Sequence, residues 1–142
     1  MNNDRSRIVK ISKLEYETLA NLRYSLRQFL RFSEDAAHAA GITPQQHQAL
    51  LAIKGFPERD RVTVGELAER LQIRHHSAVG LVNRLVANGF LKREPGKNDR
   101  RQVQLTLTAR SEKVLAKLSA AHREQIRRVG PQMESLLKRL RG

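Results

Sequence analysis

The first predicted element is a long amphipathic helix. From Leu14 to Ala40 the chain contains no proline or glycine, and apolar or small residues recur at alternating spacings of three and four. These positions are Leu19, Leu22, Leu26, Phe29, Ser33, Ala36 and Ala40. At about 1.5 Å per residue such a helix is roughly 40 Å long, more than a domain of this size easily covers. We therefore expect part of its apolar stripe to pack on another subunit.

Three shorter helices follow, and their ends carry capping signals. The segments TPQQ (43–46) and TVGE (63–66) both read as capping boxes, with a threonine at the N-cap and Gln or Glu three residues later. Gly89, followed by Phe90, fits a left-handed C-cap whose next residue folds back on the last turn. The expected helices are 44–54, 64–71 and 75–88.

A strict apolar and polar alternation then predicts a β-hairpin. Residues 91–94 and 102–107 read as strands around the turn segment PGKNDR. The alternation places Val103, Leu105 and Leu107 inward. It places Gln102, Gln104 and Thr106 outward.

The C-terminal segment is expected to be helical in two pieces. A long helix is predicted from Thr108 to about Val129, and a short last helix after Gly130-Pro131, because proline interrupts helical hydrogen bonding. The whole pattern predicts a mainly α protein with a small β-hairpin wing. We expect an N-terminal dimerisation helix (1–42), a winged helix-turn-helix lobe (43–108) and C-terminal dimerisation helices (109–142) in one compact unit.

The helix predicted at 75–88 has the two-sided character of a recognition helix. Ala78, Val79, Val82, Leu85 and Val86 form one apolar stripe. The other side carries polar donors and acceptors together with a glycine, which lets a helix backbone approach closely. Serine, asparagine and histidine are poor helix formers, so a plain solvated face would rather carry Glu and Lys. The expected DNA-contacting residues here are Arg74, His76, Ser77, Gly80, Asn83 and Arg84.

The charge of the 142-residue chain also favours a polyanionic partner. The formal net charge is +13, which accelerates association with nucleic acid but identifies no mechanism, because RNA and membrane surfaces are anionic too. There is no cysteine, no apolar run of membrane-spanning length and no secretory leader pattern, so we expect a cytoplasmic protein without disulfides or membrane association.

No pattern of catalytic or metal-ligating residues stands out. Catalytic triads, P-loops and G-x-G-x-x-G segments are absent, so we expect no enzyme and no catalytic residue. His75 and His76 are adjacent and point about 100° apart on a helix, so they cannot bind one metal from a single face. We expect no metal site and no cofactor.

Two segments in this order resemble the MarR family of bacterial transcriptional regulators. They are LVNRLVANGFLKRE (81–94) and the wing signature NDRRQVQLTLT (98–108). In that family the wing reads D-x-R followed by a strand ending in Leu-Thr, which Asp99, Arg101, Leu107 and Thr108 match. The chain departs from many relatives at Arg74-His75-His76, where they carry a Ser or Asp N-cap, and this puts the base preference in doubt.

The resemblance implies an obligate homodimer that binds double-stranded DNA at a pseudo-palindromic operator, with its wings in the flanking minor grooves. The wing residues carried over to DNA are Lys97, Asp99, Arg100 and Arg101. It also implies a small aromatic or anionic effector, bound between the dimerisation helices and the DNA-binding lobe. Residues that could line that pocket are Tyr24, Arg27, Arg31, His38 and His47.

Asp99 has two interpretations. It can cap backbone amides of the turn and also hold the guanidinium of Arg101 extended toward a groove, or it can be an Asx-turn residue that happens to lie among basic side chains.

Three functions fit these observations. The first is a sequence-specific DNA-binding regulator, in particular a repressor released by an effector. The second is a non-specific architectural or RNA-binding basic protein without an effector, and the third is a helical interaction adaptor in which the charge is incidental.

Overall fold

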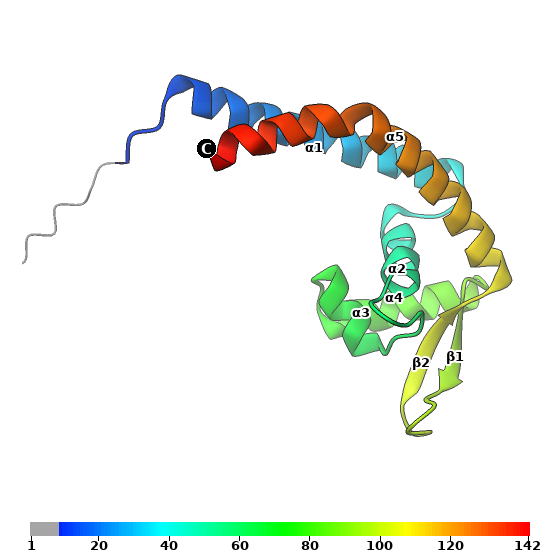
Figure 1. Ribbon diagram of the computed structural model, residues 1–142. Helices are drawn as coiled ribbons and strands as arrows, with labels where there is room; N and C mark the ends of the chain where they lie inside the picture. The colour runs from blue at the N-terminus through cyan, green and yellow to red at the C-terminus, as the bar shows by residue number, and fades with distance from the viewer. Residues whose placement is uncertain (1–8) are drawn as a thin grey trace, which may run out of the picture. The chain divides into compact units, whose positions relative to one another are not determined.

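The computed structural model describes residues 9–142, which form two compact units. Of the described residues, one unit contains 9–31 together with 124–142, and the other contains 32–123. The elements, labelled in Figure 1, are α1 (Lys13–Ala39), α2 (Pro44–Lys54), α3 (Val64–Leu71), α4 (His75–Ala87), β1 (Leu91–Pro95), β2 (Val103–Leu107) and α5 (Ala109–Arg141). This confirms a mainly helical fold with a two-stranded antiparallel hairpin.

Both predicted capping boxes are present. At the start of α2 the Thr43 hydroxyl accepts from the Gln46 amide at 3.1 Å, and the Gln46 side chain accepts from the Thr43 amide at 3.0 Å. Thr63 and Glu66 make the same reciprocal pair at 3.2 and 3.0 Å at the start of α3. Each box satisfies two amides that lack intrahelical partners, so the sequence fixes these helix starts locally.

The predicted C-cap of α4 is also confirmed. Gly89 has a φ of +76°, and its amide donates to the Val86 carbonyl at 3.1 Å. The Phe90 amide donates to the Leu85 carbonyl at 2.8 Å, which completes a Schellman motif. Phe90 is buried under the last turn of α4, so the motif fixes the direction in which the chain enters β1.

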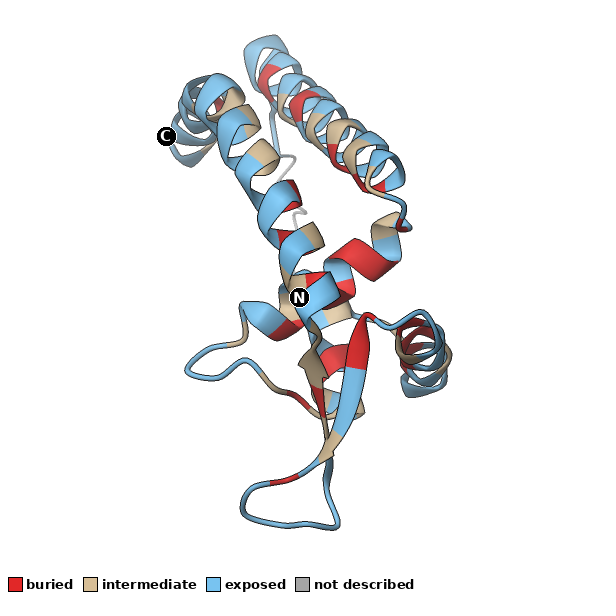
Figure 2. Ribbon diagram, turned by 90° about the vertical axis from the view of Figure 1, so that its right-hand side faces the viewer, coloured by how far each residue is buried: buried red, intermediate tan, exposed pale blue. Residues whose placement is uncertain are grey.

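The core of the 32–123 unit lies among α2, α3, α4 and the base of the hairpin, and it also includes Ala37 of α1 and Leu115 and Leu118 of α5. Figure 2 shows the buried residues in red. The buried side of α4 consists of Ala78, Leu81, Val82 and Leu85. Leu81 was not assigned to the apolar stripe, and Val79 was assigned to it wrongly, since Val79 is 38% exposed. The buried arc is centred on Ala78, and one residue further along a helix turns by about 100°, which carries Val79 off that arc.

The hairpin pairs Leu91 with Leu107, Arg93 with Leu105 and Pro95 with Val103. Leu105 is fully buried and also bridges Val62, with amide to carbonyl distances of 2.7 and 3.2 Å. The inward assignment of Val103 is wrong, because this side chain is 47% exposed. The hairpin extends past the core, so only its base has a core to face, and strand alternation alone cannot tell where that core ends.

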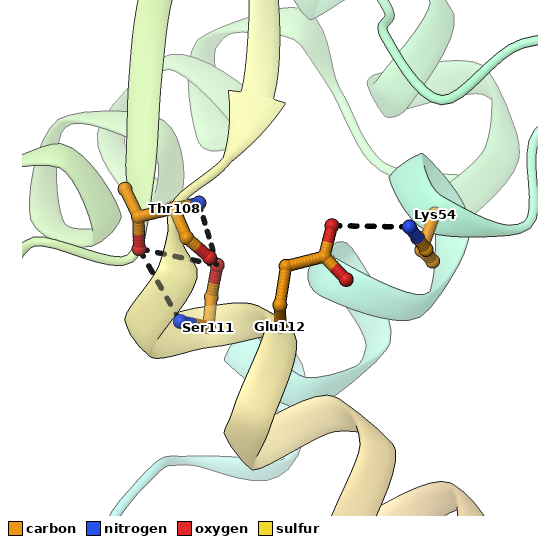
Figure 3. Close-up of polar contacts among 4 residues, drawn as sticks. All are labelled: Lys54, Thr108, Ser111 and Glu112. Atoms are coloured by element: carbon orange, nitrogen blue, oxygen red, sulfur yellow. Dashed lines mark hydrogen bonds and ion pairs between the residues drawn. The ribbon is translucent and has the colours of Figure 1, made fainter.

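Helix α5 begins at a reciprocal pair of side chains (Figure 3). The Thr108 amide donates to the Ser111 hydroxyl at 2.9 Å, and the Ser111 amide donates to the Thr108 hydroxyl at 3.2 Å. The Thr108 hydroxyl also donates to the Gly89 carbonyl at 2.7 Å, which ties the end of the hairpin to the cap of α4. An ion pair of 3.0 Å between Lys54 and Glu112 joins α2 to the same turn, and because both side chains are half exposed it adds at most about 1 kcal/mol.

The predicted break at Gly130-Pro131 is wrong, because α5 continues to Arg141 with Pro131 inside it. Proline removes one helical hydrogen bond at a cost of about 3 kcal/mol, which favours an end but does not require one. The residues after Pro131 are mostly strong helix formers, and Leu136 is buried in its unit at 6% exposure. Burial of Leu136 and the helix propensity of its neighbours favour continuation of the helix past the lost hydrogen bond.

Candidate DNA interface

The polar side of α4 lines a shallow hollow of about 470 Å³. Five of the six residues predicted on the recognition helix lie around it, namely His76, Ser77, Gly80, Asn83 and Arg84. Gln45 of α2 and the exposed Val79 complete the lining, and sequence reasoning missed both. Gln45 carried a usable signal, because the second position after an N-cap on a short helix is commonly exposed. The hollow joins hydrogen-bond donors, acceptors and one apolar side chain, the groups that read base edges in a major groove.

Arg74, the sixth predicted residue, lies at the N-cap of α4 and is exposed. Its extended backbone (φ −68°, ψ 148°) starts the helix, but no side chain caps it and the first turn contains no acidic residue. The first amides of α4 therefore have neither a side-chain cap nor an acidic residue in their own turn. Such an end, with Arg74, His75 and His76 exposed around it, suits a phosphate.

Gly80 lines the hollow without a side chain, so the helix backbone is accessible at this position. A Cβ built at this position would lie 3.6 Å from Nη1 of Arg84, which is ordinary van der Waals contact. The fold of the protein therefore does not require glycine at position 80. Because Gly80 lies mid-helix, where glycine lowers stability, a glycine here calls for another reason.

The wing tip exposes all four predicted residues, Lys97, Asp99, Arg100 and Arg101. The Asp99 carboxylate accepts a hydrogen bond from the Arg101 backbone amide at 3.0 Å. Among residues 9–142 no ion pair includes Asp99, so its recorded partner is the Arg101 backbone and not its guanidinium. This geometry matches the Asx-turn interpretation, in which the aspartate shapes the turn that presents Arg101.

Gly96 is a further determinant of the wing that the sequence reasoning missed. It is buried, and its amide donates to the Gln102 carbonyl at 2.7 Å. A Cβ at this position would lie 2.5 Å from the Asp99 carbonyl oxygen, so any other residue would push the turn apart. The Pro-Gly dipeptide before a basic turn was the available signal.

Arg93 of β1 is a second missed residue. Its guanidinium donates to Oδ1 of Asn83, so the hairpin contacts the recognition helix directly through a side chain. No motif marked it, because the contact joins residues on different elements.

The five residues predicted for an effector pocket fall in different units. Tyr24, Arg27 and Arg31 belong to the unit that includes the first part of α1, and all three are exposed. His38 and His47 belong to the other unit, where His38 is exposed and His47 is 2% exposed. Their assembly into one pocket stays a prediction.

His47 has a buried polar neighbourhood that the sequence did not indicate. Its ring lies 5.0 Å from the ring of His122, and its Nδ1 is buried with no hydrogen-bond partner among the described residues. Burial lowers the pKa of His47, and the nearby charge of His122 lowers it further. His122 itself is held by Ser33 Oγ at 2.8 Å and the Leu118 carbonyl at 2.6 Å. Both effects favour the neutral form of the His47 ring.

In the described part of the chain, no three histidine or acidic side chains come close enough together to hold a metal ion. No helix between residues 9 and 142 has the length and apolar character needed to cross a bilayer.

Comparison with known proteins finds a family that part of the chain resembles. Residues 40–102, which run from the end of α1 to the start of β2, match the MarR family. No functionally curated protein matches the chain.

Several solved structures are similar in fold. A MarR family protein from Bacillus stearothermophilus is 20% identical, with 94% of this chain and 96% of that one covered at a TM-score of 0.75. AbsC, a MarR family transcriptional regulator from Streptomyces coelicolor, is 19% identical, with 84% and 80% covered and a TM-score of 0.69. A mutant MarR from E. coli complexed with operator DNA is 20% identical, with 93% and 88% covered and a TM-score of 0.58. The expected resemblance to the MarR family is confirmed for residues 40–102, and the solved structures share the fold.

Proposed function

We propose that the chain is a sequence-specific regulator of transcription that binds double-stranded DNA as a homodimer and represses until a small effector releases it. The observation that carries the proposal is the hollow on α4, where His76, Ser77, Asn83 and Arg84 surround Gly80 beside an uncapped helix start. It supports binding and not catalysis, since its groups are those of base and phosphate contacts.

The wing supports a second contact with the duplex. The Asx turn at Asp99 presents Lys97, Arg100 and Arg101 on an exposed tip, and an arginine on such a tip can enter a narrow minor groove, where the negative potential is strongest. The net charge of +13 adds long-range attraction to the same polyanion.

Dimerisation is supported by apolar side chains that the single chain leaves exposed. On α1 these are Leu14, Tyr16, Leu19, Tyr24, Leu26 and Leu30, with exposed fractions from 40% to 63%. On the last part of α5 they are Ile126 at 52% and Leu137 at 47%. Burying them against a second copy would be favourable, and a two-fold dimer reads a pseudo-palindromic operator. Such a regulator acts in the cytoplasm, with the chromosome.

Effector release is the finer part of the proposal. An anionic or aromatic ligand that fits Tyr24, Arg27, Arg31, His38 and His47 would stabilise a spacing of the two recognition helices that does not match successive major grooves. Because the coupling is reciprocal, operator DNA must weaken ligand binding by the same factor.

A titration of fluorescent DNA tests both parts. The duplex upstream of the chain's own gene and a scrambled duplex are titrated in parallel, with and without a panel of small phenolic acids. Preference for the upstream duplex supports the regulator, and a phenolic acid that binds the protein while DNA affinity stays unchanged contradicts effector release. Equal affinity for both duplexes with a steep salt dependence would instead favour an architectural protein.

A further inference from the structure

The hydrogen bond between Arg93 and Asn83 joins the wing to the recognition helix at a position where a strand would ordinarily carry an apolar residue. Opposite residues of an antiparallel pair share one face, so Arg93 lies on the face of Leu105, its partner, and of Leu91. Leu105 and Leu91 are 0% and 2% exposed. Arg93 thus interrupts the inward face of β1, and its exposed guanidinium reaches out of the core to Oδ1 of Asn83.

The bond determines what Asn83 offers to a ligand. Oδ1 accepts from Arg93, so the amide is turned with Nδ2 away from that bond, and Nδ2 donates to no described residue. Asn83 lines the hollow on α4 together with Ser77, Gly80 and Arg84. No ion pair among residues 9–142 includes Arg93, so its recorded polar partner in that part of the chain is Oδ1 of Asn83. Held in this way, Asn83 presents the donor Nδ2 to whatever enters the hollow.

Adenine and guanine present different donors and acceptors in the major groove, so an asparagine bonded to Arg93 and a free asparagine should prefer different bases. A free asparagine reads adenine by donating to N7 and accepting from N6, which needs both ends of the amide. Accepting from the cationic guanidinium uses one of the two lone pairs of Oδ1 and makes the other a weaker acceptor, while guanine presents two acceptors, N7 and O6, that suit donors.

We propose, on the basis of the proposed DNA binding, that Arg93 is a positioning residue that holds Asn83 as a donor and thereby makes the pair prefer guanine over adenine at one position of each half-site. Arg93 acts through Asn83, and the wing thus contributes to base choice in the major groove in addition to any contact that its tip makes.

The experiment begins with wild-type protein and a duplex library randomised over roughly 20 base pairs, two half-sites about one helical turn apart. The selected duplex is then altered one base pair at a time, and the affinity of each duplex is measured by fluorescence anisotropy. We expect one position in each half-site at which guanine is preferred over adenine by about tenfold, the effect of one good base contact.

The variant Arg93→Met tests the role of the guanidinium while retaining an unbranched stem over Leu105. Oδ1 of Asn83 is then free to accept, so the preference at that position should fall at least tenfold or turn to adenine. Asn83→Ala should abolish the preference in either background. Arg93→Lys keeps the charge but loses the planar guanidinium, so the preference of this variant for guanine should also weaken. This variant provides the test if Arg93→Met does not fold.

Lys92→Met is the matched control. Lys92 is the neighbouring residue on β1, pairs with Thr106 on the opposite face and carries the same charge, so its loss should leave the order of base preferences intact. An unchanged preference in Arg93→Met or Arg93→Lys overturns the inference, and so does an adenine preference in the wild type. If the wild type selects no sequence at all, the proposed function itself fails, which is a distinct result.

Discussion

Replacing Gly80 by alanine should stabilise the protein and weaken its binding to DNA. A glycine inside a helix costs roughly 0.5 to 1 kcal/mol relative to alanine, because it loses more backbone entropy on folding. At Gly80 the added methyl would lie 3.6 Å from Nη1 of Arg84, an ordinary contact at the end of a flexible side chain, so no steric penalty offsets the gain. We expect the free energy of unfolding to rise by about 0.5 to 1 kcal/mol.

The same methyl group should interfere with DNA. It would stand on the floor of the hollow that His76, Ser77 and Asn83 surround, where a base edge must approach the helix backbone. Loss of one base contact costs about 1 to 3 kcal/mol, which weakens affinity at least fivefold. Urea denaturation at equal protein concentration and anisotropy titration of operator DNA measure the two effects on the same sample.

Gly65→Ala is the control for Gly80→Ala. Gly65 is a helical glycine of α3, a built Cβ would meet nothing nearer than 3.9 Å, and it lies outside the hollow on α4. It should raise stability in the same direction and leave DNA affinity unchanged. Lower stability of Gly80→Ala would refute the packing argument, and unchanged DNA affinity would show that the hollow does not approach the duplex closely.

Three further predictions concern the wing and the buried histidine. Asp99→Ala removes the acceptor of the Arg101 amide and should weaken DNA binding by about 1 kcal/mol, although a negative charge is lost. Asp99→Asn keeps an acceptor and should bind DNA at least as well as the wild type. Stronger DNA binding by Asp99→Ala than by the wild type would contradict this role. Arg101→Ala should weaken the free energy of DNA binding by about 1 to 3 kcal/mol and remove a preference for A·T-rich flanks. Equal binding of the wild type to A·T-rich and G·C-rich flanks would exclude a minor-groove role for Arg101. His47 has a pKa below 6.5 in the folded state, mainly because of burial, so the unfolded chain takes up its proton first and stability should fall as the pH drops below about 6.5. His47→Leu should flatten that fall in urea denaturation, and an unaltered pH profile would assign the dependence to other groups.

The helix ends could be predicted from the sequence because they depend on neighbouring residues. The reciprocal pairs at Thr43 and Thr63 and the left-handed Gly89 each act within four residues, so their spacing is visible in the chain. The end of α5 could not be predicted, because whether Pro131 stops a helix depends on the burial of Leu136 beyond it. The inward assignments of Val79 and Val103 were wrong for a related reason. Periodicity locates the apolar face of a helix or strand but not how far the core extends along that face.

The polar face of α4 was predicted residue by residue, because helical geometry alone gathers His76, Ser77, Gly80, Asn83 and Arg84 around the hollow. Its surroundings were not predicted. Arg93 reaches Asn83 from another element, and Gly96 is needed because the carbonyl of Asp99 closes over it, and neither contact follows from sequence spacing. The part of the site that lies on one helix could be predicted from the sequence, and the part that folding brings together from different elements could not.

In the proposed function, α4 and the wing distinguish DNA sequences and do more than attract a polyanion. The most direct measurement is the ratio of affinities for a selected operator and for a scrambled duplex of equal length, at physiological salt and with a salt titration of each. We predict a ratio of about a thousand or more, which falls toward one when Asn83 and Arg84 are both replaced by alanine. A ratio near one in the wild type, with steep and equal salt slopes for both duplexes, would contradict the account.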